Sequence, residues 1–237
     1  MVKVVRAALC HTDVIIRNGQ AGHVTYPVIP GHEFAGIIES CGENVSNVKL
    51  GDRVAVHTMM GCGLCSPRCR AGDNAACEVY TEPGSKRDGG FAEYCALPAR
   101  HLHKIPEHLT FEEAALMEPL ANAVSAVRAA AIELGDKVVI IGPGPIGLLA
   151  VRIAALANPS KLVLVGTRDE RLALGKEFGA THTVNIRKEG GREALKDILG
   201  PGGADAVIEG AGTQSSMDLA MEIIGWRGRI AVEGIFG

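Results

Sequence analysis

The pattern of apolar positions changes character near residue 118. Before that point the apolar runs are short and broken by glycine and proline, as at 34–39, 52–56 and 91–97, which is typical of a small β-barrel or sandwich. Beyond it, apolar runs alternate with stretches of helical periodicity, and this succession indicates a parallel, doubly wound sheet. We therefore expect an α/β protein with a β-rich domain over 1–118 and a doubly wound domain over 119–237.

The second half gives the more regular prediction. Its strands are expected at 138–141, 161–165, 181–184, 206–209 and 229–232. Its helices are expected at 146–156, 169–178, 192–199 and 214–224. A full sheet of this class usually has a sixth strand. Because the sequence stops soon after the fifth run and opens almost directly on a strand-like run, we expect a chain that is truncated at both ends.

Composition and charge exclude several classes of function. Hydrophobic residues make up 47% of the 237 positions and charged residues 22%, as in a globular protein. The net charge of −3 and the pI of about 6.2 argue against nucleic acid or an anionic membrane as a partner. We find neither an apolar stretch of the roughly 20 residues that a membrane span needs nor a signal-peptide core. Seven cysteines in such a chain are expected to be metal ligands or buried thiols, which favours a cytoplasmic location.

Two separate segments carry residues that suit a catalytic metal. The first is Cys10-His11-Thr12-Asp13 and the second is Gly31-His32-Glu33. A thiolate, an imidazole and a carboxylate together suit Zn²⁺, and a mixed set with one open position is the catalytic type. Asp13 is a candidate acceptor for the second ring N–H of His32. The alternatives are that Cys10 is a small buried apolar residue and that His32 and Glu33 only begin a strand.

A second set consists of four cysteines between residues 62 and 77, namely Cys62, Cys65, Cys69 and Cys77. Core packing does not explain so many thiols in so short a segment, whereas a structural zinc site with all four positions filled does. The alternative is a redox-active dithiol at Cys62 and Cys65. Such a motif normally accompanies a βαβ unit, and this one lies in irregular sequence.

A glycine-rich loop lies between the first strand and the first helix of the second half. Its sequence is Gly142-Pro143-Gly144-Pro145-Ile146-Gly147, and such a loop lets a pyrophosphate approach the backbone and the helix N-terminus. About 20 residues further on, NAD-binding chains usually carry a carboxylate for the ribose. This chain has Gly166-Thr167-Arg168 there, which favours the 2′-phosphate of NADP. The alternatives are an empty turn and a solvated Arg168, and Asp169 is expected to begin the next helix.

These segments resemble the zinc-dependent medium-chain alcohol dehydrogenase superfamily, and within it the polyol and threonine dehydrogenase branch. The resemblance covers essentially the whole chain. Besides the metal-type sets and the glycine loop, it rests on residues 31–36, 88–94 and 118–124. It implies a GroES-like catalytic domain over 1–118 and a Rossmann domain over 119–237 that lacks its last strand. It further implies homo-oligomers, although the strand that commonly builds their interface is missing here.

The resemblance also implies the roles of individual residues. Cys10, His32 and Glu118 would hold the catalytic zinc, with Glu33 as a ligand or a close neighbour. Thr12 would contact the substrate oxygen, and His11 would lie near the cofactor phosphates. The expected activity is hydride transfer between a secondary alcohol or polyol, or a threonine-like hydroxy compound, and NADP in preference to NAD. From its position alone, Glu118 could also be a surface residue, and His57 is expected to be a partly exposed loop histidine.

Two departures keep other interpretations open. The gap between Cys65 and Cys69 is one residue wider than the family pattern, so residues 66–68 must bulge for Cys69 to reach a metal. The missing segments leave a non-catalytic, zinc-stabilised nucleotide-binding fragment as the alternative function. A zinc-ribbon nucleic-acid binder would account for the four cysteines, but the acidic pI argues against it.

Overall fold

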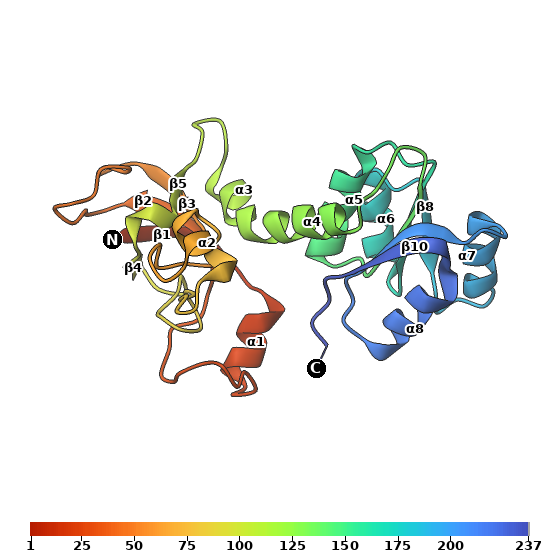
Figure 1. Ribbon diagram of the computed structural model, residues 1–237, viewed down its shortest axis with the longest axis horizontal. Coiled ribbons are helices and arrows are strands. Elements are labelled where there is room, and N and C mark those ends of the chain that lie inside the picture. Colours follow the sequence, from red (N-terminus) through yellow and green to blue (C-terminus); the bar gives the residue numbers. More distant parts are fainter. Residues whose placement is uncertain (237) are drawn as a thin grey trace. The chain divides into compact units, whose positions relative to one another are not determined.

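The computed structural model describes residues 1–236, and it divides into two compact units (Figure 1). The first unit is Met1–Glu118, and the second begins at Pro119. Each unit contains a five-stranded sheet and a buried apolar core of its own. Among the described residues, no helix is both long and apolar enough to cross a membrane.

The sheet of the first unit is antiparallel, with the strand order β4-β1-β2-β3-β5. Its strands are β1 Val2–Ala8, β2 Glu33–Ile38, β3 Arg53–Val56, β4 Tyr94–Cys95 and β5 Leu102–Lys104. Its helical segments are α1 His11–Arg17, α2 Pro67–Arg70, α3 Phe111–Ala115 and the short 3₁₀ turns Asn74–Ala76 and Ala99–His101. This β-rich unit agrees with the fold class expected for the first half.

One of the expected apolar runs forms much less strand than its pattern indicates. The run at 91–97 contributes only the two residues of β4, because the backbone before it bonds to a loop and not to a strand. Gly89, Gly90 and Phe91 donate their N–H groups to the carbonyl oxygens of residues 29–31 at 2.8–3.0 Å. A Cβ at Gly89 would lie 2.1 Å from the carbonyl oxygen of Gly31, so this close approach requires glycine.

The second unit has a parallel sheet with the strand order β10-β9-β6-β7-β8, and the parallel doubly wound class is confirmed. Its strands are β6 Lys137–Ile141, β7 Lys161–Gly166, β8 His182–Asn185, β9 Ala204–Glu209 and β10 Ile224–Val232. Its helices are α5 Pro145–Ala155, α6 Asp169–Glu177, α7 Gly191–Leu199 and α8 Gln214–Ile223, while α4 Met117–Ala129 begins at the boundary. β10 starts five residues earlier than expected, and its pairing with β9 shifts register between Ile224 and Arg229.

The core of the second unit lies on both faces of its sheet. Neighbouring residues of one strand point to opposite faces, so Val138 and Ile140 pack on one side while Val139 and Ile141 pack on the other. Residues of α4 and α5 complete the first cluster, and residues of α7 and α8 complete the second. This arrangement explains why the strands appear in the sequence as continuous apolar runs.

Candidate functional site

The sheet of the first unit brings Cys10 close to His32 and Glu33. β1 and β2 run antiparallel, and Ala8 pairs with Glu33, so the residues that follow β1 lie beside the residues that begin β2. The Cys10 sulfur, a ring nitrogen of His32 and a carboxylate oxygen of Glu33 all lie within 4.8 Å of one another. His32 and Glu33 are buried and Cys10 is half-buried. Three donor types that are far apart in the sequence therefore converge at one end of the sheet.

Asp13 holds this group of side chains together. It lies in the first turn of α1 and is only 3% exposed. One carboxylate oxygen accepts the Cys10 N–H at 2.9 Å, and the other accepts the Gly31 N–H at 3.0 Å. The second oxygen also lies 3.4 Å from Nδ1 of His32. Nε2 of His32 faces Glu33, at 3.9 Å from its Oε1, and is the nitrogen left for a metal.

The ionisation of these groups is strongly perturbed. Burial alone lowers the pKa of His32, but its hydrogen bonds with Asp13 and Cys10 outweigh this and raise the pKa to about 11. Burial, together with the nearby charge of Glu118, raises the pKa of Glu33. Two carboxylates that disfavour each other's charge are stabilised by a cation between them. The donor types therefore fit a divalent metal such as Zn²⁺, and His32 would release its ring proton on binding it.

Thr12 and His11 occupy the same turn as Asp13. The Thr12 side chain is partly exposed and His11 is exposed, while α1 begins directly after Cys10. The short helix therefore places the hydroxyl of Thr12 next in sequence to the buried carboxylate of Asp13 and two residues after the candidate ligand Cys10.

The four cysteines of the second set also converge. All four sulfurs lie within 4.8 Å of one another, and the pairs Cys62–Cys69 and Cys65–Cys77 are 3.9 and 3.8 Å apart. Backbone N–H groups point at the sulfurs, and those of Leu64 and Cys65 lower the pKa of Cys62 to about 6. Burial and the neighbouring thiols, in contrast, raise the pKa of Cys65 to about 11. The convergence of four sulfurs, and not a common tendency to ionise, is what fits a tetrahedral zinc site.

The extra residue between Cys65 and Cys69 is accommodated by a helical turn. Ser66 caps α2, and its hydroxyl accepts the N–H of Cys69 at 3.1 Å. Pro67 occupies the first helical position, where its missing N–H costs nothing. The bulge expected at 66–68 is therefore this short helix, and it delivers Cys69 to the other thiols.

In the second unit, the glycine loop connects β6 to α5. Gly142 has φ 107°, which side-chain-bearing residues rarely adopt, and a Cβ at Gly147 would lie 1.9 Å from the carbonyl oxygen of Gly142. A Cβ at Gly144, in contrast, would meet nothing within 4 Å. The loop therefore packs tightly at its first and last glycines and is open at the middle one, where Pro145 begins α5. It follows the carboxyl end of β6, between β9 and β7, where doubly wound sheets bind nucleotides.

The end of β7 offers no free carboxylate. Gly166 is buried, and Thr167 and Arg168 are exposed just before α6. The Asp169 side chain is engaged elsewhere, because Asn185 donates to it at 2.8 Å and Lys188 forms an ion pair with it at 2.8 Å. Asp169 therefore anchors the start of α6 to the segment around β8, and Thr167 and Arg168 are the groups available to a ligand.

Sequence reasoning missed one buried carboxylate close to this loop. Glu209 ends β9 and is 0% exposed, and its Oε1 accepts the N–H groups of Ala211 and Gly212 at 2.8 and 2.9 Å. Residues 210 and 211 in turn pack against Gly142. The signal that could have revealed Glu209 was a charged residue directly at the end of an apolar run.

His57 proves to be part of a small histidine cluster in the first unit. Its ring lies 5.9 Å from that of His101 and 6.1 Å from that of His103, measured between centroids. Its Nδ1 is buried and has no hydrogen-bond partner among the described residues. The three rings are not among the described groups that could hold a metal ion.

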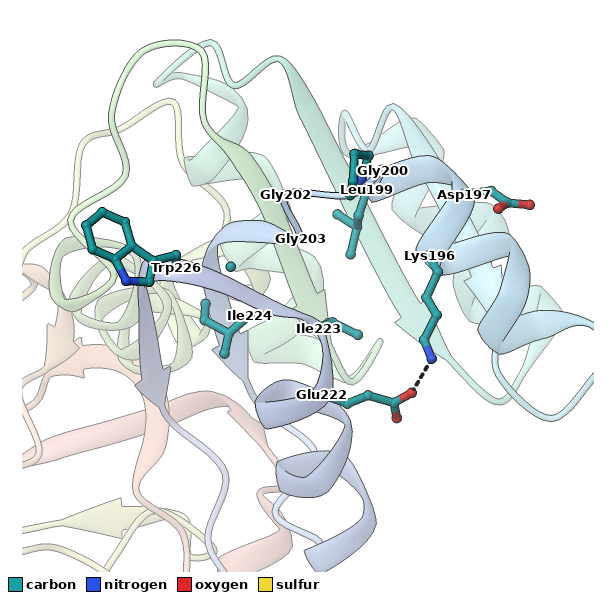
Figure 2. A pocket seen from close by; sticks show the side chains of 12 residues that line it. Lys196, Asp197, Leu199, Gly200, Gly202, Gly203, Glu222, Ile223, Ile224 and Trp226 are labelled. Carbon is teal, nitrogen blue, oxygen red and sulfur yellow. Dashed lines mark ion pairs between the residues drawn. The ribbon is translucent and has the colours of Figure 1, made fainter.

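Two hollows are lined by none of the metal-type residues and by none of the residues of the glycine loop. One, of about 650 Å³, opens beside the amino ends of β9 and β10, where Figure 2 shows Lys196 pointing toward Glu222 and Asp197 pointing away. Nucleotides bind at the opposite, carboxyl ends of such strands, so this hollow is not the cofactor site. The other, of about 600 Å³, lies at the end of α1 and is lined by Ile16, Arg17, Tyr26 and neighbouring prolines.

Comparisons with known proteins fit both units. Residues 1–107 match the alcohol dehydrogenase GroES-like domain, and residues 145–237 match the zinc-binding dehydrogenase family. The chain is 37% identical to L-threonine 3-dehydrogenase of Bacillus velezensis, over 97% of its own length and 67% of the relative's.

Solved structures agree with these matches. A proposed zinc-binding dehydrogenase from Sinorhizobium meliloti, bound to NADP, has a TM-score of 0.90 and 34% identity, with 99% of this chain and 69% of that one covered. Galactitol-1-phosphate dehydrogenase from Escherichia coli has a TM-score of 0.85 and 32% identity, with 99% and 67% covered. The chain therefore spans about two thirds of the length of the proteins that it resembles.

Proposed function

The chain belongs to the zinc-dependent medium-chain alcohol dehydrogenase superfamily, and from this premise we propose that Cys10, His32 and Glu118 hold its catalytic zinc with Glu33 beside the metal. The class of reaction is hydride transfer between an alcohol and NAD(P). The observation that carries the proposal is the convergence of the Cys10 thiol, the His32 imidazole and the Glu33 carboxylate within 4.8 Å, a group that does not itself include Glu118. The influence of Glu118 on the pKa of Glu33 supports its inclusion in the same group.

The other residues of the first unit have separate roles in the proposed mechanism. Zinc, when bound, acts as a Lewis acid that lowers the pKa of an alcohol oxygen. Asp13 fixes the ring of His32 through Nδ1 and leaves Nε2 for the metal. Thr12, partly exposed in the same turn, would accept the substrate's hydroxyl proton and pass it toward solvent. The four thiols of Cys62, Cys65, Cys69 and Cys77 would hold a second, structural zinc.

For the cofactor, we propose that the glycine loop, including residues 145–147 at the start of α5, holds the pyrophosphate. We further propose that NADP binds more tightly than NAD. Two observations support the preference. The end of β7 carries no free carboxylate, and Thr167 and Arg168 are exposed there. A guanidinium pairs with a phosphate through charge-assisted hydrogen bonds, which contribute roughly 1.5–3 kcal/mol each. The NADP bound to the Sinorhizobium meliloti protein is in line with this proposal.

For the substrate, we propose a secondary alcohol of the polyol or β-hydroxy amino acid class. The support comes from the relatives, which include L-threonine 3-dehydrogenases and a galactitol-1-phosphate dehydrogenase. The seven free thiols suit a reducing compartment, and we place the enzyme in the cytoplasm.

The proposal is tested by a panel that contains L-threonine, a polyol and a matched primary alcohol, each offered with NADP and with NAD. We expect oxidation of a secondary alcohol by the zinc-loaded chain and none by its His32→Ala variant. A zinc-loaded chain that binds nucleotide but oxidises no secondary alcohol would instead support the non-catalytic nucleotide-binding fragment.

A further inference from the structure

The glycine loop and the end of β7 are in direct steric contact. Ile141 at the end of β6 pairs with Val165 of β7, and the N–H of Gly142 donates to the carbonyl oxygen of Val165 at 2.9 Å. This register places the next residue of the loop, Pro143, against Gly166. A Cβ built on Gly166 would lie 2.4 Å from Cγ of Pro143 and 2.6 Å from its Cδ. Carbon atoms in van der Waals contact are about 3.5–4.0 Å apart, so no side chain fits at residue 166 beside this proline.

The ring of Pro143 cannot rotate away from that contact. Cγ and Cδ belong to a ring that is closed onto the backbone nitrogen, and the ring fixes φ. The loop itself is held by Gly142, with its positive φ, and by the packing of Gly147 against Gly142. The third neighbour of the built Cβ is Cδ2 of Leu172 at 3.3 Å, the end of a flexible side chain that can move by a few tenths of an ångström. The conflict at residue 166 therefore comes almost entirely from two atoms of one proline.

We propose that Pro143 and Gly166 form a single specificity-determining pair, in which the proline ring occupies the space that an NAD-selecting side chain at 166 would need. An aspartate or glutamate at the end of this strand is what binds the ribose 2′-hydroxyl of NAD. Here the loop excludes such a residue, so Thr167 and Arg168 are the exposed side chains that would recognise the 2′ position of the cofactor. The inference rests on the proposed NADP preference. It adds that Pro143 maintains this preference, so that a substitution at residue 166 alone cannot reverse it.

The steric half of the pair is testable without any cofactor. Gly166→Ala adds only the Cβ, and overpacking of this kind should lower the midpoint of thermal unfolding by roughly 4–10 °C. In a Pro143→Ala background the same change should shift the midpoint by no more than about 2 °C, because the two clashing atoms are gone. Pro145→Ala is the matched control, since it removes the other proline of the loop without opening space at 166. If Gly166→Ala lowers the unfolding midpoint equally in the unaltered chain, the Pro143→Ala variant and the Pro145→Ala variant, the proposed pairing is wrong.

The specificity half is tested by the dissociation constants of NADPH and NADH, measured through their fluorescence in the absence of substrate. We expect the unaltered chain to bind NADPH at least roughly 10-fold more tightly than NADH. Gly166→Asp alone should weaken both. Pro143→Ala with Gly166→Asp should recover NADH binding by roughly 10-fold over the single variant while NADPH stays weak, because an aspartate repels the 2′-phosphate.

The two proposals fail in different ways. Equal binding of NADPH and NADH by the unaltered chain would remove the proposed preference, and the thermal measurements would still decide whether Pro143 excludes a side chain at 166. If the preference for NADPH holds but Gly166→Asp alone gains NADH binding and keeps its unfolding midpoint, the pairing is wrong and residue 166 acts independently.

Discussion

The two units of this chain are stabilised in different ways. In the described part of the second unit, sixteen buried residues cluster on one face of the sheet and twelve on the other. The main cluster of the first unit has nine. The first unit buries the ionisable side chains of Asp13, His32, Glu33 and His101, whereas the buried ionisable side chain in the described part of the second unit is Glu209. The first unit also contains both groups of metal-type side chains. The comparison teaches that apolar periodicity encodes the second unit, whereas polar and metal-type contacts organise much of the first.

The largest expected effect comes from removing one donor of the mixed site. His32→Ala and Glu118→Ala should each reduce alcohol oxidation by roughly 1000-fold or more, because the metal's electrostatic stabilisation is worth several kcal/mol. NADPH binding should change little, since the glycine loop belongs to the other unit. Steady-state rates and nucleotide titrations on the same samples measure both. A variant that keeps normal turnover would exclude that residue from the metal site.

A substitution that creates a cavity in the core of the second unit should have the next largest effect, on stability, and should leave the metal sites unchanged. Leu164 is fully buried in β7, and Leu164→Ala should lower the free energy of unfolding by about 2–5 kcal/mol. Leu174→Ala, at a side chain that is 43% exposed, is the matched control and should cost far less. Denaturant unfolding measures the loss of stability, and elemental analysis measures the zinc content. Loss of zinc in the Leu164 variant would contradict the separation of the two units.

A smaller effect is expected from the carboxylate that orients His32. Asp13→Asn keeps the size of the side chain but removes its charge, and should weaken zinc binding at the mixed site by roughly 10–100-fold. The four-cysteine site should keep its zinc, because Asp13 does not contact it. Competition with a chromophoric chelator resolves the two affinities. Equal weakening at both sites would mean that the substitution unfolds the first unit as a whole.

The smallest effect should come from acid acting on the histidine cluster. Burial, followed by the charge of His103, lowers the pKa of His57, and burial likewise lowers the pKa of His101. Both groups bind protons more weakly when folded than when unfolded, so their contribution to stability is complete above about pH 6.5 and is lost as the pH falls below it. The protection factors of the amides in β3 and β5, in which the intrinsic pH dependence of exchange is divided out, should therefore fall as the pH is lowered from 7 to 5.

Acid also weakens zinc binding, so this experiment needs its own control. A His57→Gln, His101→Gln variant loses zinc in the same way but lacks the two titrating rings, and its protection factors should respond less to pH. In the second unit, whose only histidine is His182, the protection factors should respond least. An identical pH response in the variant and the unaltered chain would show that the histidine cluster does not contribute.

Much of the second unit could be predicted from the sequence because its strands are buried on both faces. What the pattern could not show was the extension of β10 through residues 225–228, where the chain passes exposed Trp226 and Arg227 takes φ 61°. The contact between Pro143 and Gly166 was equally hidden, since it depends on the register of two neighbouring strands.

In the first unit the spacing of cysteines indicated a four-thiol group, because thiols so close in sequence need little help from the fold. The mixed group is different. Cys10 and His32 meet only because β1 and β2 pair in one register, and that pairing had no strong signal in the irregular sequence around it. The role of the Ser66 cap in delivering Cys69 was hidden for a similar reason, since it depends on a four-residue helix.

The zinc content of three matched samples tests the central claim most directly. Elemental analysis of the folded, zinc-loaded chain should give about two zinc ions per chain, one for a site of mixed donors and one for a site of four thiolates. Cys10→Ser should lose about one zinc together with alcohol oxidation, and Cys62→Ser with Cys65→Ser should lose the other while NADPH binding persists. A single zinc in the unaltered chain, or no change in zinc content in either variant, would contradict the assignment of two separate metal centres to the first unit.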